Sequence, residues 1–232
     1  MILYVFYYNI FLMGSVTVLF HHILKKCNVE TQLYEKFSIN MMRSLICGSI
    51  AHEAYQKYNY IWLDKCLNNP VIYHKFENYH SMFLAYFVFD TILLFYQVYI
   101  RIEKTIRLDL LFHHLLAISA LLIIEENKMY GISLMIGLSE GMSLVTGPKL
   151  LTMYYGNKYL TNICIVYRLL YLIFIRMLFI WPSLIYFYHI TTNQCDNYKE
   201  NRNILLVIGL VMTIIHAEIN WFHSGRKELA RI

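Results

Sequence analysis

The feature that most constrains this chain is a series of long apolar segments. A helix needs roughly 17 to 25 largely apolar residues to cross a hydrocarbon core about 30 Å thick. Seven segments approach or exceed that length, namely Ile2–Leu24, Phe37–Tyr55, Tyr79–Ile100, Leu108–Ile124, Tyr130–Tyr155, Leu160–Ile190 and Asn203–Phe222. The sequence therefore predicts an all-α fold, a multi-pass membrane bundle of about seven transmembrane helices.

The overall composition points the same way. Of the 232 residues, 58% are hydrophobic and only 15% are charged, whereas soluble domains carry about 25% charged residues. The 20 Lys and Arg are dispersed and form no stripe that could follow a nucleic-acid backbone. Membrane lipids are therefore the expected partners, and nucleic acid is not.

Several segments carry features of their own. The first has no Lys or Arg before it and Lys25 and Lys26 directly after it, which is typical of a retained anchor and not of a cleaved signal peptide. The fifth is diluted by Gly, Ser and Pro and is expected to be short and buried. The sixth exceeds one crossing and carries Pro182, which predicts a kink. The stretch Asn59–Glu77 suits a loop at the membrane interface.

The distribution of positive charge predicts the orientation. Eleven Lys and Arg fall in loops on the side shared with the C-terminus and six on the other side, so the C-terminus is expected in the cytosol and the N-terminus in the lumen. Residues 1–36 would then form an anchor and cytosolic loop, and residues 37–232 one membrane domain. Cys66 and Cys195 would share the lumen, which permits a disulfide between them.

Ionisable residues occur inside the predicted spans. Such a group near the bilayer centre costs about 2.5 to 3.5 kcal/mol and is expected to face a partner or a cavity. We therefore predict that these groups converge on one site, with Arg176 paired to Glu140 or Asp90. The alternative is that they only hold helices together through interhelical hydrogen bonds. The candidates are Asp90, His113, His114, Glu140, Arg176 and His216, with Arg43, His52, Arg168 and Glu218 also inside spans.

Helical spacing adds polar stripes on two segments. Positions 216, 220 and 223 recur at i, i+4 and i+7 and place His216 and Asn220 on one helix face. Asn40, Arg43 and Ser44 begin a similar stripe that continues through positions 47 and 51. The ten His form none of the closely spaced boxes of di-iron membrane enzymes, and no zinc-protease, serine-hydrolase or phosphate-loop motif occurs. No metal or cofactor is therefore predicted.

The order of these signatures resembles the TLC domain family, which includes ceramide synthases and the translocation-associated membrane protein. The likeness covers roughly residues 40 to 227. It rests on Tyr86-Phe-Val-Phe-Asp90, then Leu111-Phe-His113-His114-Leu, then Glu140 with Ser143 and Thr146, then Phe174-Ile-Arg176 followed by Pro182, and last Asn220-Trp221-Phe222.

The resemblance implies six core helices around a central lipid-accommodating cavity, a peripheral first span and residence in the endoplasmic reticulum. It also implies acyl-CoA as substrate and N-acyl transfer, in which His113 carries the acyl group and a carboxylate assists. The implied catalytic residues are His113, His114 and Asp90, and the implied cavity residues are Glu140, Arg176, His216, Asn220 and Ser44.

The chain departs from ceramide synthases at two points. It has no second His-Asp pair after His114, and Cys47 stands where the family has a His on the early helix. It is therefore nearer to the small TLC domain proteins. Two functions are kept as alternatives. The first is a protein of lipid homeostasis that binds an acyl chain or a sphingoid-type lipid in its cavity, with or without ceramide-synthase-like acyl transfer. The second is a non-enzymatic accessory protein for membrane cargo or translocation. A transporter is disfavoured because no inverted repeat is visible.

Overall fold

The structure, a computed structural model, describes residues 2–27, 29–30, 33–60, 70–100, 102–127 and 129–186. Every regular element within these ranges is helical, which confirms the all-α class for this part of the chain. The seventh predicted span, with His216 and Asn220, lies outside the described residues, as do Cys66 and Cys195. The elements are α1 (Ile2–Lys26), α2 (Tyr34–Lys57), α4 (Pro70–Tyr99), α5 (Leu108–Asn127), α6 (Tyr130–Ser139), η2 (Glu140–Val145), α7 (Thr146–Tyr154), α8 (Lys158–Tyr171) and η3 (Leu172–Ile180).

Four of the described helices are long and apolar enough to cross a membrane. They are Tyr4–Lys26, Phe76–Tyr99, Leu108–Glu126 and Lys158–Tyr186, and they correspond to the first, third, fourth and sixth predicted spans. The second and fifth predicted spans fall on α2 and on the continuous run α6–η2–α7. By length and apolar composition alone, neither counts as a membrane-spanning helix, so their crossing of the membrane stays a prediction.

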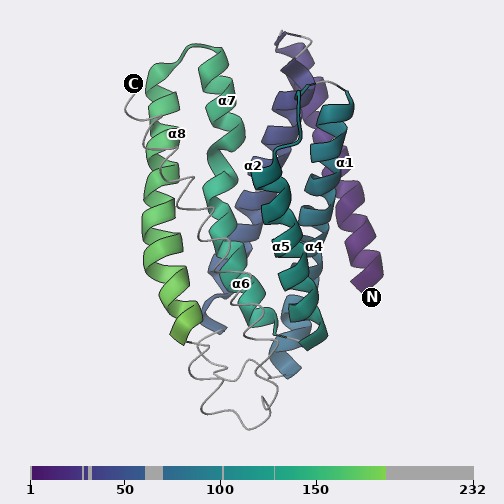
Figure 1. Cartoon of the computed structure of the whole chain (residues 1–232), viewed down its shortest axis with the longest axis vertical. Coiled ribbons are helices and arrows are strands. Elements are labelled where there is room, and N and C mark those ends of the chain that lie inside the picture. The colour runs from purple at the N-terminus through teal and green to yellow at the C-terminus, as the bar shows by residue number, and fades with distance from the viewer. Residues whose placement is uncertain are drawn as a thin grey trace.

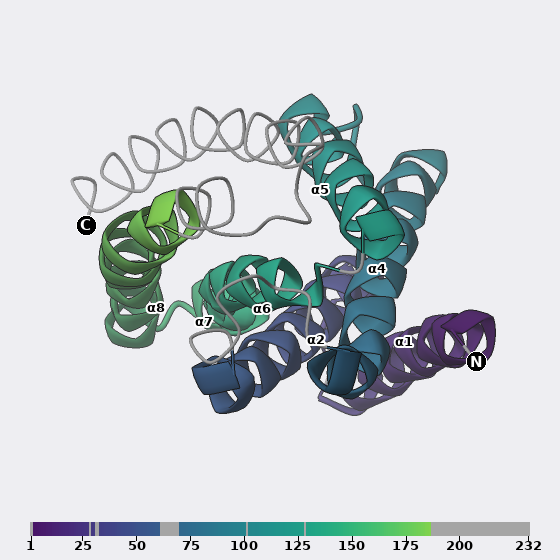
Figure 2. The same ribbon diagram turned by 90° about the horizontal axis from the view of Figure 1, so that it is seen from below.

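The helices run up and down along the long axis of the bundle (Figure 1). Helix α2 is the hub, because it packs against α1, α4, α6, η2 and α7. Among the described elements, helix α1 packs mainly against α2 and α4, and it lies at the outside of the bundle (Figure 2). On the opposite side, α8 packs against α7, η2 and η3. This arrangement explains how α2 accommodates Ser38, Asn40 and Ser44, which are buried on the side of the helix that faces its neighbours.

Helices α2, α4 and α6 supply most of the apolar core, and the largest fully buried side chains come from α4. Tyr79, Phe83 and Phe87 stack along one face of this helix, with the Phe83 and Phe87 ring centroids 5.1 Å apart. All three are buried and contact residues of the other helices in one cluster, including Met42 of α2 and Leu121 of α5. Large apolar side chains on the outer faces are exposed instead, as in Phe11 and Leu178. Exposed apolar faces on the outermost helices suit contact with lipid.

Two glycines permit close helix packing around η2. A Cβ at Gly147 would lie 2.8 Å from Met41 Cα and 2.9 Å from the Asn40 carbonyl oxygen, so the backbones of α7 and α2 touch. A Cβ at Gly141 would lie 2.2 Å from the Tyr171 hydroxyl. Small residues at such positions are typical of packed membrane helices. They account for the dilution of the fifth apolar segment.

One sequence-based prediction is corrected, and one is extended while the kink at Pro182 stays a prediction. The stretch Asn59–Glu77 is not a loop throughout, because α4 begins at Pro70, a position where proline is favourable since its missing N–H has no helical partner. In the sixth segment, helical geometry changes before Pro182. The run Leu172–Ile180 forms a π-helix, in which the helix widens around Arg176.

Candidate functional site

Two departures from α-helical geometry face each other in the bundle. The 3₁₀ segment η2 begins at Glu140, and the π-helical segment η3 contains Arg176; both of these side chains are buried. Tyrosines of α8 bond to the backbone at the first break: the Tyr171 hydroxyl donates to the Leu138 carbonyl at 2.5 Å, and the Tyr167 hydroxyl to the Gly141 carbonyl at 3.2 Å. Mid-helix 3₁₀ and π segments often mark functional sites.

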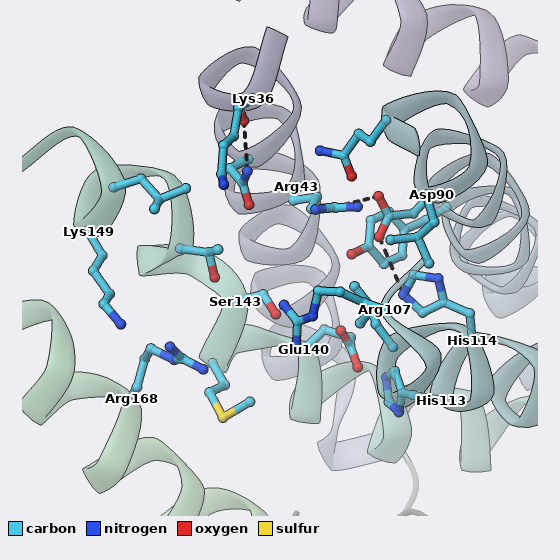
Figure 3. A pocket seen from close by; sticks show the side chains of 18 of the residues that line it. Lys36, Arg43, Asp90, Arg107, His113, His114, Glu140, Ser143, Lys149 and Arg168 are labelled. Carbon is cyan, nitrogen blue, oxygen red and sulfur yellow. Dashed lines mark hydrogen bonds and ion pairs between the residues drawn. The ribbon is translucent and has the colours of Figure 1, made fainter. Parts of the chain in front are cut away.

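A cavity of about 460 Å³ lies between these breaks and helices α2, α4 and α5. We call it the polar cavity. Five predicted site residues line it together, namely Asp90, His113, His114, Glu140 and Arg176. Figure 3 shows that the labelled side chains among them point into one space from different helices. The structure thus brings these five predicted residues together around one cavity.

Asp90 is the electrostatic centre of one wall. Its side chain is 1% exposed, Arg43 Nε lies 2.6 Å from Oδ1, and His114 Nε2 lies 3.4 Å from Oδ2. The second His114 nitrogen, Nδ1, is 3.4 Å from the Thr91 hydroxyl. One buried carboxylate therefore holds a guanidinium and orients an imidazole, an arrangement that fixes the imidazole ring in place. The wall joins α2, α4 and α5.

Glu140 and Arg176 meet through a hydroxyl. Arg176 Nη2 donates to Ser139 Oγ at 3.3 Å, and the same oxygen lies 3.4 Å from Glu140 Oε1. The Cys47 thiol approaches Glu140 Oε2 at 3.9 Å. Arg176 therefore sits on the Glu140 side of the cavity, while Asp90 takes Arg43 as its cationic partner.

His113 occupies the boundary between two environments. Its ring packs edge-on against Phe87 at 5.8 Å and lies 5.7 Å from the His114 ring. Successive helical residues point about 100° apart, so His114 turns to Asp90 while His113 faces a second space of about 30 Å³. We call this second space the apolar recess. It is lined by Phe87, Ala117, Ile136, Ile180, Trp181 and Leu184, and it shares His113, Ser139, Glu140 and Arg176 with the polar cavity.

Ser44 lies beside the polar cavity and is not part of its lining. The Ser44 hydroxyl donates to the Ser143 carbonyl at 3.1 Å and accepts from the Gly147 N–H at 2.8 Å. It links α2 to the broken helix. The structure therefore gives Ser44 a structural contact in place of a position in the cavity lining, whereas Asn40 and Arg43 of the same stripe do reach the lining.

Several cavity residues were not predicted, although their helical spacing in the sequence could have indicated them. Met142, Thr146, Lys149 and Met153 all line the cavity, and their spacing of i, i+4, i+7 and i+11 is that of one helix face. In the prediction of orientation, Lys149 was one of the eleven Lys and Arg assigned to loops on the side of the C-terminus. Its burial, with 8% of the residue exposed, follows from the continuation of the fifth segment as α7. No spacing rule connects Arg43 to Asp90, 47 residues away.

The chemistry of the site is that of acids, bases and nucleophiles. Within the described ranges, no three His, Cys, Asp or Glu side chains converge as metal ligands would. Imidazole is a nucleophile and a general base, and a carboxylate held beside it orients the ring and stabilises positive charge. His113, His114 and Asp90 together supply these elements next to an apolar recess.

Compared with known proteins, the chain matches no family model, no curated protein and no solved structure. The likeness to the TLC domain family thus rests on the residues named above, and it stays a prediction.

Proposed function

We propose that this chain is an integral membrane protein that holds a lipid-type amphiphile inside its helical bundle. The polar group of the ligand occupies the polar cavity of about 460 Å³. Its hydrocarbon part begins at the apolar recess, which at about 30 Å³ takes only the first atoms of a chain, and continues toward the bilayer. The observation that carries the proposal is that the two spaces share one boundary, formed by His113, Ser139, Glu140 and Arg176. A cavity of several hundred Å³ in which polar groups converge beside apolar surface is a usual form of a ligand pocket.

The four membrane-length helices suggest the bilayer as the source of the ligand. An amphiphile in the bilayer already lies among the exposed apolar faces of α1, α5 and α8. The buried charges of the cavity offer its head group hydrogen bonds that hydrocarbon cannot. The endoplasmic reticulum, which the family resemblance implies, is the membrane in which we place the protein.

We further propose that the site transfers an acyl group from a thioester such as acyl-CoA to an amine. A His113 ring nitrogen attacks the thioester carbonyl carbon and the C–S bond breaks. The leaving thiolate takes the proton of the other ring nitrogen, which gives a free thiol and a neutral acyl-imidazole. The amine then attacks the acyl-imidazole, the bond from carbonyl carbon to His113 breaks, and the amine proton passes to the released imidazole. Asp90 orients His114 beside this centre. The position of His113 at the recess, with the His114 ring 5.7 Å away, favours this chemistry.

Lipid binding is tested by filling the recess. The full-length chain is purified in a mild detergent and its bound lipids are identified by mass spectrometry. Ala117→Leu places a larger side chain in the recess and is expected to reduce retained lipid severalfold. Ser119→Leu, an exposed position on the same helix, is the matched control and should retain lipid like the parent. Equal retention by both variants, or no retained lipid in the parent, would contradict the proposal.

Acyl transfer is tested separately on His113. Intact-mass analysis of the parent is expected to show a covalent acyl adduct that peptide mapping assigns to His113 and that neutral hydroxylamine removes. His113→Ala should lose the adduct while still inserting and folding, and His52→Ala, an exposed histidine on α2, should keep it. Retained lipid with no adduct would remove the enzymatic step and favour the accessory-protein alternative.

A further inference from the structure

The indole of Trp181 carries a polar atom that the fold leaves without a partner. Its Nε1–H is buried and makes no hydrogen bond among the described residues. A buried donor without an acceptor is unfavourable, and most such groups in proteins are paired with protein atoms or ordered water. Trp181 is also one of the residues that line the apolar recess. An acceptor atom of a ligand in the recess would satisfy this donor.

The π-helical segment η3 brings Trp181 to this position. The Trp181 backbone N–H donates to the Arg176 carbonyl, which is the hydrogen bond between residues five apart that defines a π-helix. In an α-helix, residues five apart would point about 140° away from each other, because each residue turns the chain by about 100°. The wider turn of η3 brings them closer to one face. Arg176, Ile180, Trp181 and Leu184 all line the recess as a result.

The size of the recess limits what can accept this hydrogen bond. Its volume is about 30 Å³, and a cavity needs about 10 to 15 Å³ to hold one water molecule. A group of about two non-hydrogen atoms therefore fits. In so small a space, such a group lies close to all the lining residues, which include Trp181 and His113. Ser139 and Glu140 also line the recess, yet neither accepts the Trp181 hydrogen bond.

From these observations we infer that Trp181 Nε1 donates a hydrogen bond to the carbonyl oxygen of an acyl ligand held at the recess. This inference rests on the proposed function and adds a residue that selects acyl ligands over alkyl ligands with the same chain. A carbonyl group fits because it has two non-hydrogen atoms, accepts hydrogen bonds and joins the polar head of an acyl lipid to its chain. The site has the same order, since the polar cavity meets the apolar recess at one boundary.

The test compares two ligands that differ only in the carbonyl oxygen. Binding of a monoacylglycerol and of the monoalkylglycerol ether with the same chain is measured by native mass spectrometry on the full-length chain in neutral detergent. The acyl ligand is expected to bind about tenfold more tightly, because the ether leaves Nε1 without its acceptor. Trp181→Phe removes the N–H, keeps an aromatic ring and should bring the ratio of the two affinities to about one. The ratio does not depend on the folded fraction, since both ligands bind the same folded protein.

Loss of a donor from another aromatic side chain is the control. Tyr159→Phe removes a hydroxyl from an exposed position near the start of α8 and should keep the affinity ratio of the parent. A parent that binds both ligands equally, as expected if water is the acceptor, would overturn the inference and leave the proposed function standing. A preference that survives in Trp181→Phe, or that both variants lose equally, would also overturn it. Binding of neither ligand by the parent would remove the proposed function together with the inference.

The presence of His113 at the same recess extends the test to the proposed acyl transfer. When a His113 nitrogen attacks a carbonyl carbon, negative charge develops on the carbonyl oxygen, and a donor aimed at that oxygen lowers the barrier. Removing one such donor typically slows a reaction about 100-fold to 1,000-fold. Trp181→Phe is therefore expected to slow formation of the His113 adduct about 100-fold, and Tyr159→Phe to leave its rate unchanged. Equal rates in the parent and Trp181→Phe would contradict a role of the donor in transfer. If the parent forms no adduct, the affinity ratio alone decides the inference.

Discussion

At the scale of single residues, the pair of Arg43 and Asp90 is the feature on which the site depends most. The Asp90 side chain is 1% exposed and that of Arg43 is 12% exposed, so neither charge is compensated by water. Removing one member of a buried pair leaves the other charge without compensation and typically costs about 3 to 5 kcal/mol. Replacing both by apolar residues is often nearly neutral. The pair is therefore needed as a unit.

We expect Arg43→Met to lower the melting temperature of the detergent-purified protein strongly and the double variant Arg43→Met/Asp90→Leu to recover most of that loss. Lys36→Met is the control, because Lys36 and Glu103 form an ion pair at 2.8 Å whose side chains are both about one-third exposed. Such a pair is worth about 0 to 1 kcal/mol. Thermal unfolding of the four proteins decides the matter; a stable Arg43→Met variant would show that Asp90 is compensated in another way.

At the scale of elements, the close contact of α7 with α2 holds the broken helix in place. The Cβ of an alanine at position 147 would meet backbone atoms of Met41 and Asn40 within 3 Å, and backbone cannot move aside as a flexible side chain can. We expect Gly147→Ala to destabilise the protein by about 1 to 3 kcal/mol, as overpacking does, and to weaken lipid retention because Lys149 moves with α7.

Gly14→Ala is the matched control for this prediction. A Cβ at Gly14 meets nothing within 4 Å, and alanine is favoured over glycine in a helix by about 1 kcal/mol. This variant should be as stable as the parent or slightly more so. Thermal melting in the same detergent measures both variants. A Gly147→Ala protein that melts with the parent would mean that α7 and α2 tolerate a wider separation.

The helices were predictable from the sequence where a continuous apolar segment is long enough to cross a membrane. The apolar segments that begin at Tyr79 and Leu108 appear as α4 and α5 because a continuous apolar run has few alternatives to a helix. The changes of helix type at Glu140 and Leu172 were not predictable. They depend on contacts such as the Tyr171 hydroxyl with the Leu138 carbonyl, which join residues far apart in the sequence.

The residues of the candidate site were more predictable from the sequence than the ion pairs and hydrogen bonds between them. Burial costs in a membrane single out Asp90 and Arg176 without any structure. The positions of α2, α4 and η3 decide which cation pairs with which carboxylate. The sequence left open whether Arg176 pairs with Glu140 or with Asp90, whereas in the structure Asp90 pairs with Arg43. Ser44 satisfied the spacing rule, yet the near approach of α7 turned its hydroxyl to the backbone.

At the scale of the whole molecule, the polar cavity reaches one end of the bundle. The segment between α4 and α5 contributes Glu103, Thr105 and Arg107 to its lining. That segment and the α7–α8 connection lie at the same end (Figure 1). The distribution of Lys and Arg predicts that this end faces the cytosol. Under the proposed function, a water-soluble thioester carrier would then reach the polar cavity from the cytosol, and a lipid would reach it from the bilayer.

The native cysteines test this orientation without added tags. Cys27 is exposed at the end of α1, whereas Cys47 and Cys164 are buried; Cys66 and Cys195 are predicted to face the lumen. We expect a membrane-impermeant maleimide to label Cys27 in sealed microsomes whose cytosolic face is outward. Cys66 and Cys195 should react only after permeabilisation, and only after reduction as well if they are bridged. Because mass spectrometry assigns each label to its cysteine, the unlabelled residues serve as internal controls. Labelling of Cys66 or Cys195 in sealed vesicles, with Cys27 protected, would invert the topology and place the mouth of the cavity in the lumen.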